Sequence, residues 1–376
     1  DNSDLAAQPK GEPFNGYDCY AMGMLHFWIA VRTEAFMKLG VKLDTLSTYL
    51  KTALGDYGGL DLVKPRETAD AMLRQATKLE PDHYWSHFWL GWSYLETDPP
   101  QWHAAEMAFS KCIEIRPQFS FGYGERGLLR IRLWSEIRDD LWRRALQHHG
   151  SEDLRQALHL SPDDPTIHWI HARANEFLGK GPEMVAHCAQ AVELEAPLKS
   201  LDGRSLERNS TLAEGVKKFL EDRLANRLGM DAEAIIAQAW WVLANEQNAL
   251  DVALKVLKAN PKQPRALAVR GAVMLRRGQL KEALSDFDAA LDKLPMLFLA
   301  SAGRGRALEL LDRHQDALDN YDKILTGIAK TDWQRLEGYL GRARALAALG
   351  RVDDAQAALE HAEEIMPGIT EAVGKK

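Results

Sequence analysis

The chain has 376 residues, of which 46% are hydrophobic and 27% charged, and its formal net charge is −7 at pH 7. This composition is typical of a folded soluble protein, and the acidic balance argues against a nucleic-acid-binding protein with a basic surface. Cys19, Cys112 and Cys188 lie far apart and form no CxxC pair, so neither a disulfide framework nor a zinc site is expected. We expect a cytoplasmic protein.

Residues 1–64 are expected to form a helical segment that packs on or caps the rest of the chain. Their longest apolar run, residues 20–31, has 12 residues, which is too short to span a bilayer. It has no basic leader and so does not resemble a signal peptide. We expect no membrane partner. The chain begins at Asp1 rather than Met, which suggests a piece of a longer protein.

From residue 65 onward, helical spacing dominates and strand patterns are nearly absent. The run PRETADAMLRQATKLEP places Ala69, Leu73 and Ala76 on one face and ends at Pro81. It reads as the second helix of a hairpin, whose first helix should lie in residues 43–55. The next stretch, YWSHFWLGWSYLETDPPQWHAAEMAFSKCIEIRP, predicts two more helices ending at Pro117.

A fixed period then becomes visible between Pro261 and Pro295. Three residues of this stretch, Gly271, Ala283 and Phe287, have counterparts 34 residues later. These counterparts are Gly305, Ala317 and Tyr321. A small residue in each first helix allows the second helix to approach closely. A proline then ends the second helix.

This pattern resembles the tetratricopeptide repeat, a 34-residue helix–turn–helix unit. The resemblance implies an all-α solenoid, a right-handed superhelix of about seven repeats. The small residue of each first helix falls at Gly91, Gly127, Ala172, Ala237, Gly271, Gly305 and Ala343. We expect an N-terminal repeat block at residues 65–197, a connector and joining helix at 198–229, a C-terminal block at 230–367 and a tail at 368–376.

The hexapeptide GYGERG, residues 122–127, fits the dinucleotide-binding pattern G-x-G-x-x-G. A dinucleotide turn needs a strand just before it and an acidic residue about 20 residues later. Here a helix end and a proline precede it, and Gly127 occupies the small position of the second full repeat. We therefore predict that the motif lies in a helix and binds no nucleotide.

Two stretches depart from the period. In the second full repeat, the spacing from Gly127 to Gly150 is nearly twice that between the matching positions Gly271 and Ala283 of a regular repeat. We therefore expect elongated helices that project beyond the array. Trp134 and Trp142 would form a second interface there, for a partner or a second copy, or would pack on the chain's own N-terminal helices.

The joining segment has its own pattern. Its leucines and a valine, spaced four apart, predict a helix that ends at Gly229 as a C-cap.

The family resemblance also implies a concave groove lined by the first helices. Its lining would be aromatic in the early repeats and would contain several arginines in the later ones. The matching positions, where a protein or peptide segment would bind, are Trp85, Phe88, Trp92, Phe121, Trp169, Arg173, Arg265, Arg306 and Arg344. Aromatic and arginine side chains are the usual anchors of binding surfaces. The alternative is that several of them pack helix against helix or are covered by residues 1–60.

No catalytic motif of the hydrolase, P-loop or kinase type is present, so we expect neither catalysis nor a cofactor. His168 and His171 can share a helix face, and His187 would be a third ligand if folding brought it close. Structural histidines are the preferred interpretation, and a metal or small-molecule site in the groove is the rival.

A narrower resemblance covers about 50 residues, PDHYWSHFWLGWSYLE and AFSKCIEIRPQFSFGYGERGL. These runs are similar to the tetratricopeptide regions that follow the kinase domain in planctomycete-type bacterial serine/threonine kinases. The likeness implies the docking or regulatory arm of a signalling protein. The sequence thus favours a non-catalytic scaffold for protein binding, with a self-assembling scaffold as a further alternative.

Overall fold

The computed structural model describes residues 15–38, 64–197, 211–223 and 228–369, and every regular element in these ranges is a helix. This confirms the expected all-α solenoid. By its contacts the chain divides into two compact units, Asp1–Leu160 and Ser161–Lys376. The division into blocks expected from the sequence stays a prediction, and residues 43–55, 198–210 and 370–376 lie outside the described ranges.

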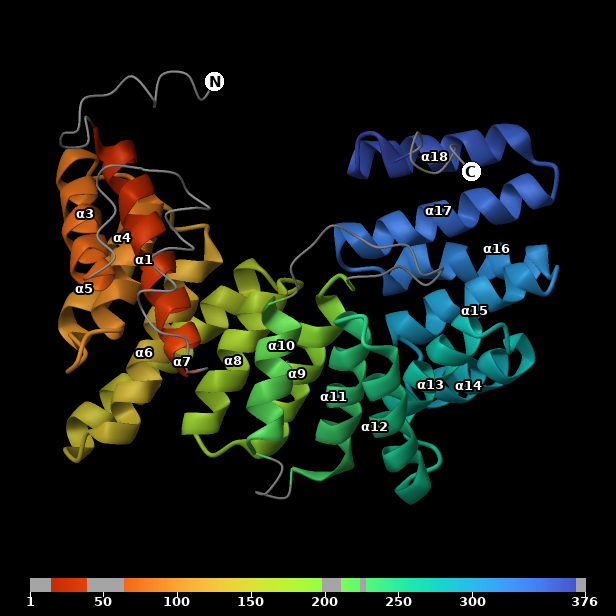
Figure 1. The fold of residues 1–376 in the computed structure, drawn as a ribbon, viewed down its shortest axis with the longest axis horizontal. Helices are drawn as coiled ribbons and strands as arrows, with labels where there is room; N and C mark the ends of the chain where they lie inside the picture. Colours follow the sequence, from red (N-terminus) through yellow and green to blue (C-terminus); the bar gives the residue numbers. More distant parts are fainter. Residues whose placement is uncertain (1–14, 39–63, 198–210, 224–227, 370–376) are drawn as a thin grey trace. The chain divides into compact units, whose positions relative to one another are not determined.

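The described helices of the first unit pack in three successive pairs (Figure 1). Its helices are α1 (Gly16–Lys38), α3 (Pro65–Leu79), α4 (Tyr84–Leu95), α5 (Trp102–Ile115), α6 (Ser120–Glu136) and α7 (Asp140–Leu160). Helix α1 packs against α3 and takes the place of a first helix. A Cβ atom on Gly23 of α1 would lie 2.8 Å from the Leu73 side chain, so the close approach of these two helices requires glycine.

The second unit continues the hairpins to the end of the described chain (Figure 1). Its helices are α8 (Pro165–Phe177), α9 (Gly181–Leu194), α10 (Thr211–Glu221), α11 (Gly229–Val242), α12 (Glu246–Ala259), α13 (Pro264–Arg276), α14 (Leu280–Lys293), α15 (Phe298–Leu310), α16 (His314–Lys323), the π-helical turn η3 (Ile324–Ile328), α17 (Asp332–Ala348) and α18 (Val352–Ile365). Helix α10 packs on α9 and α11, and its apolar face joins their core.

Glycines and aromatic rings set the spacing between repeats. A Cβ on Gly271 would lie 2.9 Å from the Phe287 ring, and one on Gly303 would lie 2.3 Å from it. Tyr321, one period later, fits the same way between Gly305 and Gly341. In α14 and α16 the ring of the second helix therefore fills a hole between two successive first helices. This explains why small and aromatic residues recur together.

The second full repeat is elongated, as predicted, because α6 has 17 residues and α7 has 21, compared with 12 and 14 in the preceding hairpin. The GYGERG motif lies inside α6. A Cβ on Gly127 would come within 3.0 Å of the Gly150 carbonyl oxygen on α7. These two glycines thus allow two long helices to pack closely.

The prediction that the joining helix ends at Gly229 is wrong. Helix α10 ends at Glu221, and Gly229, with φ of +81°, is instead the first residue of α11. The Arg223 guanidinium donates a 2.9 Å hydrogen bond to the Phe219 carbonyl oxygen, one of the carbonyls that a helix end leaves unpaired. The same guanidinium lies 3.7 Å from the centre of the Phe219 ring.

Candidate binding groove

The predicted groove residues of the first unit form an aromatic cluster. Trp85, Phe88 and Trp92 lie on α4, and Phe121 lies on α6. The Phe88 ring meets those of Trp85 and Phe121 edge to face, with centroids 5.4 Å and 6.3 Å apart. Phe88 is buried, whereas Trp85, Trp92 and Phe121 are half-buried. The cluster therefore serves as core and still leaves aromatic surface accessible on rigid helices.

Helix α1 adds aromatic surface that the sequence did not indicate. Trp28 is 49% exposed, and its ring centroid lies 6.1 Å from that of Trp89 on α4. Phe27, which is buried, lies 5.4 Å from the same Trp89 ring. The signal in the sequence is the apolar run at residues 20–31, which contains both Phe27 and Trp28.

The predicted groove residues on α8 lie close to the joining helix. The Trp169 ring meets Phe219 of α10 edge to face at 5.0 Å. Arg173, one turn further along α8, is half-buried. The joining helix thus covers part of the face that the family resemblance assigns to a partner.

Arg265 binds a carboxylate of its own chain. Its guanidinium contacts the Glu193 carboxylate at 2.9 Å, and the two side chains are 11% and 9% exposed. Glu193 also accepts hydrogen bonds from the Gln238 side chain and, at 2.7 Å, from the Phe298 backbone N–H. The end of α9 is therefore tied to α11, α13 and α15. Sequence reasoning missed Glu193 because its partners lie far along the chain.

The same end of α9 also contacts α17. The Trp333 indole N–H donates to the Leu194 carbonyl oxygen at 2.9 Å. The Gln334 side-chain amide donates to the Glu193 carbonyl oxygen at 3.1 Å. The carbonyls of a helix's last turn have no partner within the helix, and here a helix much later in the sequence satisfies two of them. The C-terminus of α9 thus contacts four successive first helices.

Arg306 and Arg344 share one buried acid. Glu309, whose side chain is 6% exposed, accepts from Arg306 at 2.5 Å and from Arg344 at 2.9 Å. The Tyr321 hydroxyl bonds to the same carboxylate, and burial first, then the negative charge of Glu309, raises the pKa of Tyr321 well above its ordinary value. Burial alone would lower the pKa of Arg344, but the charge and hydrogen bond of Glu309 together with the neighbouring Tyr321 and Glu337 outweigh it and raise that pKa.

The two predicted tryptophans of the elongated repeat differ in exposure. Trp134 is half-buried, with the Arg143 guanidinium 5.3 Å from its ring centre. Trp142 is 65% exposed and the adjacent Leu141 is 78% exposed. The Asp139 carboxylate accepts from the Trp142 backbone N–H at 2.9 Å, which fixes the start of α7.

The three histidines of the rival hypothesis do come together, but as a stack. The His168 Nε2–H donates to the Pro162 carbonyl oxygen at 2.9 Å, so the Nδ1 of neutral His168 accepts from the His187 Nδ1–H at 3.0 Å. The His171 ring stacks on His187 at 4.7 Å. Burial, then the neighbouring histidines, lowers the pKa of His187 to about 4.

Within the described ranges, no group of three or more His, Cys, Asp or Glu side chains is arranged to hold a metal ion. Burial raises the pKa values of Cys112 and Cys188 to about 12, so both thiols are protonated near neutral pH. None of the described helices has the combination of length and apolar character that crossing a bilayer requires.

One family model matches part of the chain. The tetratricopeptide repeat family model matches two overlapping stretches, residues 237–297 and 275–332, which include α12 to α16. No curated protein sequence matches the chain.

Several solved structures are similar to the chain at low identity. A tetratricopeptide repeat protein from Parabacteroides merdae is 15% identical, with a TM-score of 0.33, over 75% of this chain and 93% of its own. A thermophilic tetratricopeptide repeat protein from Thermus thermophilus is 15% identical, with a TM-score of 0.34, over 57% of this chain and 92% of its own. Yeast Tom70 is 12% identical, with a TM-score of 0.33, over 83% of this chain and 57% of its own.

Proposed function

We propose that this chain, whose residues 237–332 are tetratricopeptide repeats, is a non-catalytic scaffold that binds a protein or peptide segment. The binding surface is the aromatic face of α4 and α6, extended by Trp28 of α1. The observation that carries the proposal is the half-buried state of Trp85 and Trp92 in a cluster held by Phe88. Large rigid aromatic side chains on fixed helices lose little conformational freedom when they bind.

The later arginines are assigned a smaller share of the binding. Arg265 contacts Glu193, whose side chain is 9% exposed. Arg306 and Arg344 contact Glu309, whose side chain is 6% exposed. A partner that used these arginines would compete with an internal carboxylate at close range. Of the predicted groove residues, we therefore expect the aromatic ones to anchor the partner and the arginines to hold the repeats together.

Site-specific photo-cross-linking tests this proposal. A benzophenone amino acid replaces Trp92 in one variant and the exposed Leu310 in another, and each is expressed in the source cells. We expect partner adducts, identified by mass spectrometry, at position 92 and not at position 310. Equal adduct patterns at both positions, or none at 92 in a variant that melts like the wild type, would refute the aromatic face as the binding surface.

A second candidate function, self-assembly, is favoured by the exposure of Leu141 and Trp142 at the start of α7. Two adjacent apolar side chains at the end of a projecting hairpin could pair with those of a second copy. Light scattering on the Trp142→Ser variant tests it, with Trp28→Ser as the matched control. An assembly that dissociates in the first variant alone would support it, and an unchanged mass in both would exclude it.

The docking or regulatory arm of a larger signalling protein is the narrower form of the proposal. Its support is the resemblance of residues 81–128 to regions that follow bacterial kinase domains. An antibody against this chain, used on an immunoblot of source cells, should then detect a protein well above 42.2 kDa. A single band at that mass would exclude the larger signalling protein and support a stand-alone scaffold.

A further inference from the structure

Two arginines of first helices bridge to second helices on both sides, and each has a partner 16 residues earlier. Arg304 of α15 contacts Asp288, 16 residues earlier on α14, at 2.6 Å and Asn320, 16 residues later on α16, at 3.2 Å. Arg126 of α6 contacts Ser110, again 16 residues earlier, at 3.1 Å, and Asp153 on α7 at 2.8 Å. Each of these arginines is held between the preceding second helix and its own.

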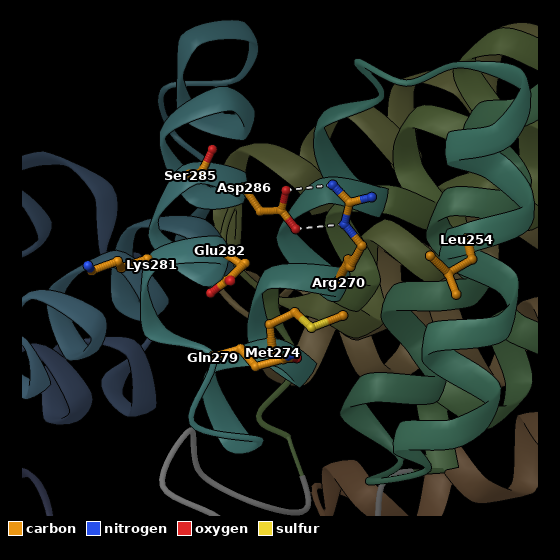
Figure 2. Close-up of a pocket in the computed structure, with 8 residues that line it drawn as sticks. All are labelled: Leu254, Arg270, Met274, Gln279, Lys281, Glu282, Ser285 and Asp286. Atoms are coloured by element: carbon orange, nitrogen blue, oxygen red, sulfur yellow. Dashed lines mark hydrogen bonds and ion pairs between the residues drawn. The ribbon is translucent and has the colours of Figure 1, made fainter.

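Arg270 of α13 has one half of this arrangement (Figure 2). Its Nε and Nη2 atoms donate to the two carboxylate oxygens of Asp286, 16 residues later, at 2.7 Å each. At the equivalent position on the preceding second helix stands Leu254, where the next repeats carry Asp288 and Asp322. Leu254 is 43% exposed. Among the described residues, the third nitrogen of Arg270, Nη1, has no hydrogen-bond partner.

An open pocket of about 640 Å³ lies at this point, between α12, α13 and α14. Arg270 and Asp286 lie on one side of it and Leu254 on the other, and the Met274 side chain adds apolar surface between them. The exposed Lys281 and Glu282 also line it, with opposite charges that offset each other. The pocket therefore combines a guanidinium edge with a free donor and two apolar side chains.

We propose that this pocket binds an acidic side chain of a partner peptide, next to an apolar side chain of the same peptide. The acidic group stands where Leu254 leaves the preceding second helix without an acid, and it accepts from Nη1 of Arg270. Asp288, at the matching position one repeat later, accepts from Nε of Arg304 instead. The apolar group lies on Leu254 and Met274. Guanidinium–carboxylate hydrogen bonds are among the stronger and more directional contacts in proteins, and the apolar contact excludes water from them.

This site is separate from the aromatic groove. Arg270 follows the inner-face position Arg265 by five residues, which places it about 140° around the helix. The pocket also belongs to the second unit, whereas the aromatic cluster belongs to the first. Its partner need not be the one bound by the aromatic face.

A selection with random 12-residue peptides displayed on phage tests the proposal. The full chain is immobilised, and the enriched peptides are synthesised and their affinities measured. We expect a class with Asp or Glu beside Leu, Ile, Met or Phe. These peptides should bind Leu254→Asp at least tenfold more weakly than wild type, because the introduced carboxylate would accept from Nη1 of Arg270 in place of the acid of the peptide.

The controls make each outcome decisive. Leu310→Asp introduces the same change at another exposed leucine and should leave the affinity within twofold. Changing the acidic residue of a peptide to Asn or Gln should weaken it at least tenfold on wild type and have little effect on Leu254→Asp. The proposal is wrong if no such class is enriched, or if its peptides bind wild type and Leu254→Asp equally. Peptides that lose binding in Trp92→Ala instead belong to the aromatic groove.

Discussion

The predicted groove residues of the two units solve the same packing problem with different chemistry. In the first unit, Phe88 is buried among aromatic rings while Trp85 and Trp92 keep part of their surface exposed. In the second unit, Arg265 and Arg306 are held by buried carboxylates. An aromatic side chain can stabilise the fold with one side and bind a partner with the other. A guanidinium that is already paired with a carboxylate of its own chain has few hydrogen-bond donors left for a partner.

The largest expected effect is at Glu193. In Glu193→Gln the Arg265 guanidinium, which is 11% exposed, loses its counter-charge. Leaving one charge of a buried pair alone costs about 4 kcal/mol, and urea denaturation measures the loss in the free energy of unfolding. Glu233→Gln is the control, because Glu233 pairs with a Lys255 side chain that is 69% exposed, and its cost should stay below about 1 kcal/mol. Equal losses in both variants would contradict a special role for the end of α9.

Next come the glycines, for which the two units should behave alike. A Cβ on Gly341 would lie 2.2 Å from the Tyr321 ring, and one on Gly91 would lie 2.7 Å from the Phe109 ring. Forcing a methyl group into either contact should destabilise the protein by about 3 kcal/mol, as thermal denaturation would show. Gly327→Ala, where nothing lies within 4 Å, is the control and should not destabilise. A mild effect at Gly91 alone would mean that the first unit packs more loosely.

A pH dependence comes third and belongs to the second unit. Because the folded-state pKa of His187 is about 4 against an ordinary 6.5, the unfolded chain binds more protons between these values. Stability is therefore lost as the pH falls from about 6.5 to 4. The full shift corresponds to about 3 kcal/mol, and solvent screening of the partly exposed ring lowers the expected loss to about 2 kcal/mol. His168, whose pKa burial also lowers, adds to the loss. Melting temperatures across this range should fall less steeply in His187→Phe, and an unchanged slope would exclude His187 as a source.

The smallest expected effect is at Arg306, and it tests directly the contrast between the predicted groove residues of the two units. Arg306→Gln leaves Glu309 with Arg344 as its counter-charge, so we expect a loss of about 1 kcal/mol in unfolding free energy. Affinity for a partner identified by cross-linking should change less than twofold. Trp92→Ala should weaken the same partner at least tenfold, as titration calorimetry would measure. A reversed order would assign partner binding to the arginines.

Much of the fold follows from local regularities in the sequence. Gly271 and Phe287 recur one period later as Gly305 and Tyr321, which specified helical hairpins because a ring on one helix requires a hole on its neighbour. The excess length after Gly127 specified the elongated helices α6 and α7. The position of Gly127 as the small residue of its repeat placed GYGERG inside a helix. Each of these conclusions depends on residues that are close in the sequence or one period apart.

The tertiary structure alone decided which side chains remain available for a partner. Glu193 meets Arg265 across several intervening helices, and the end of α9 meets Trp333 from still further along the chain. Arg270 pairs with Asp286 only, because the preceding second helix carries Leu254 where the next repeats carry an aspartate. Helical spacing fixes the face on which a side chain lies. Whether its charge is already paired, or its ring already covered, depends on groups of other repeats that stacking brings close. No local pattern in the sequence encodes those distances.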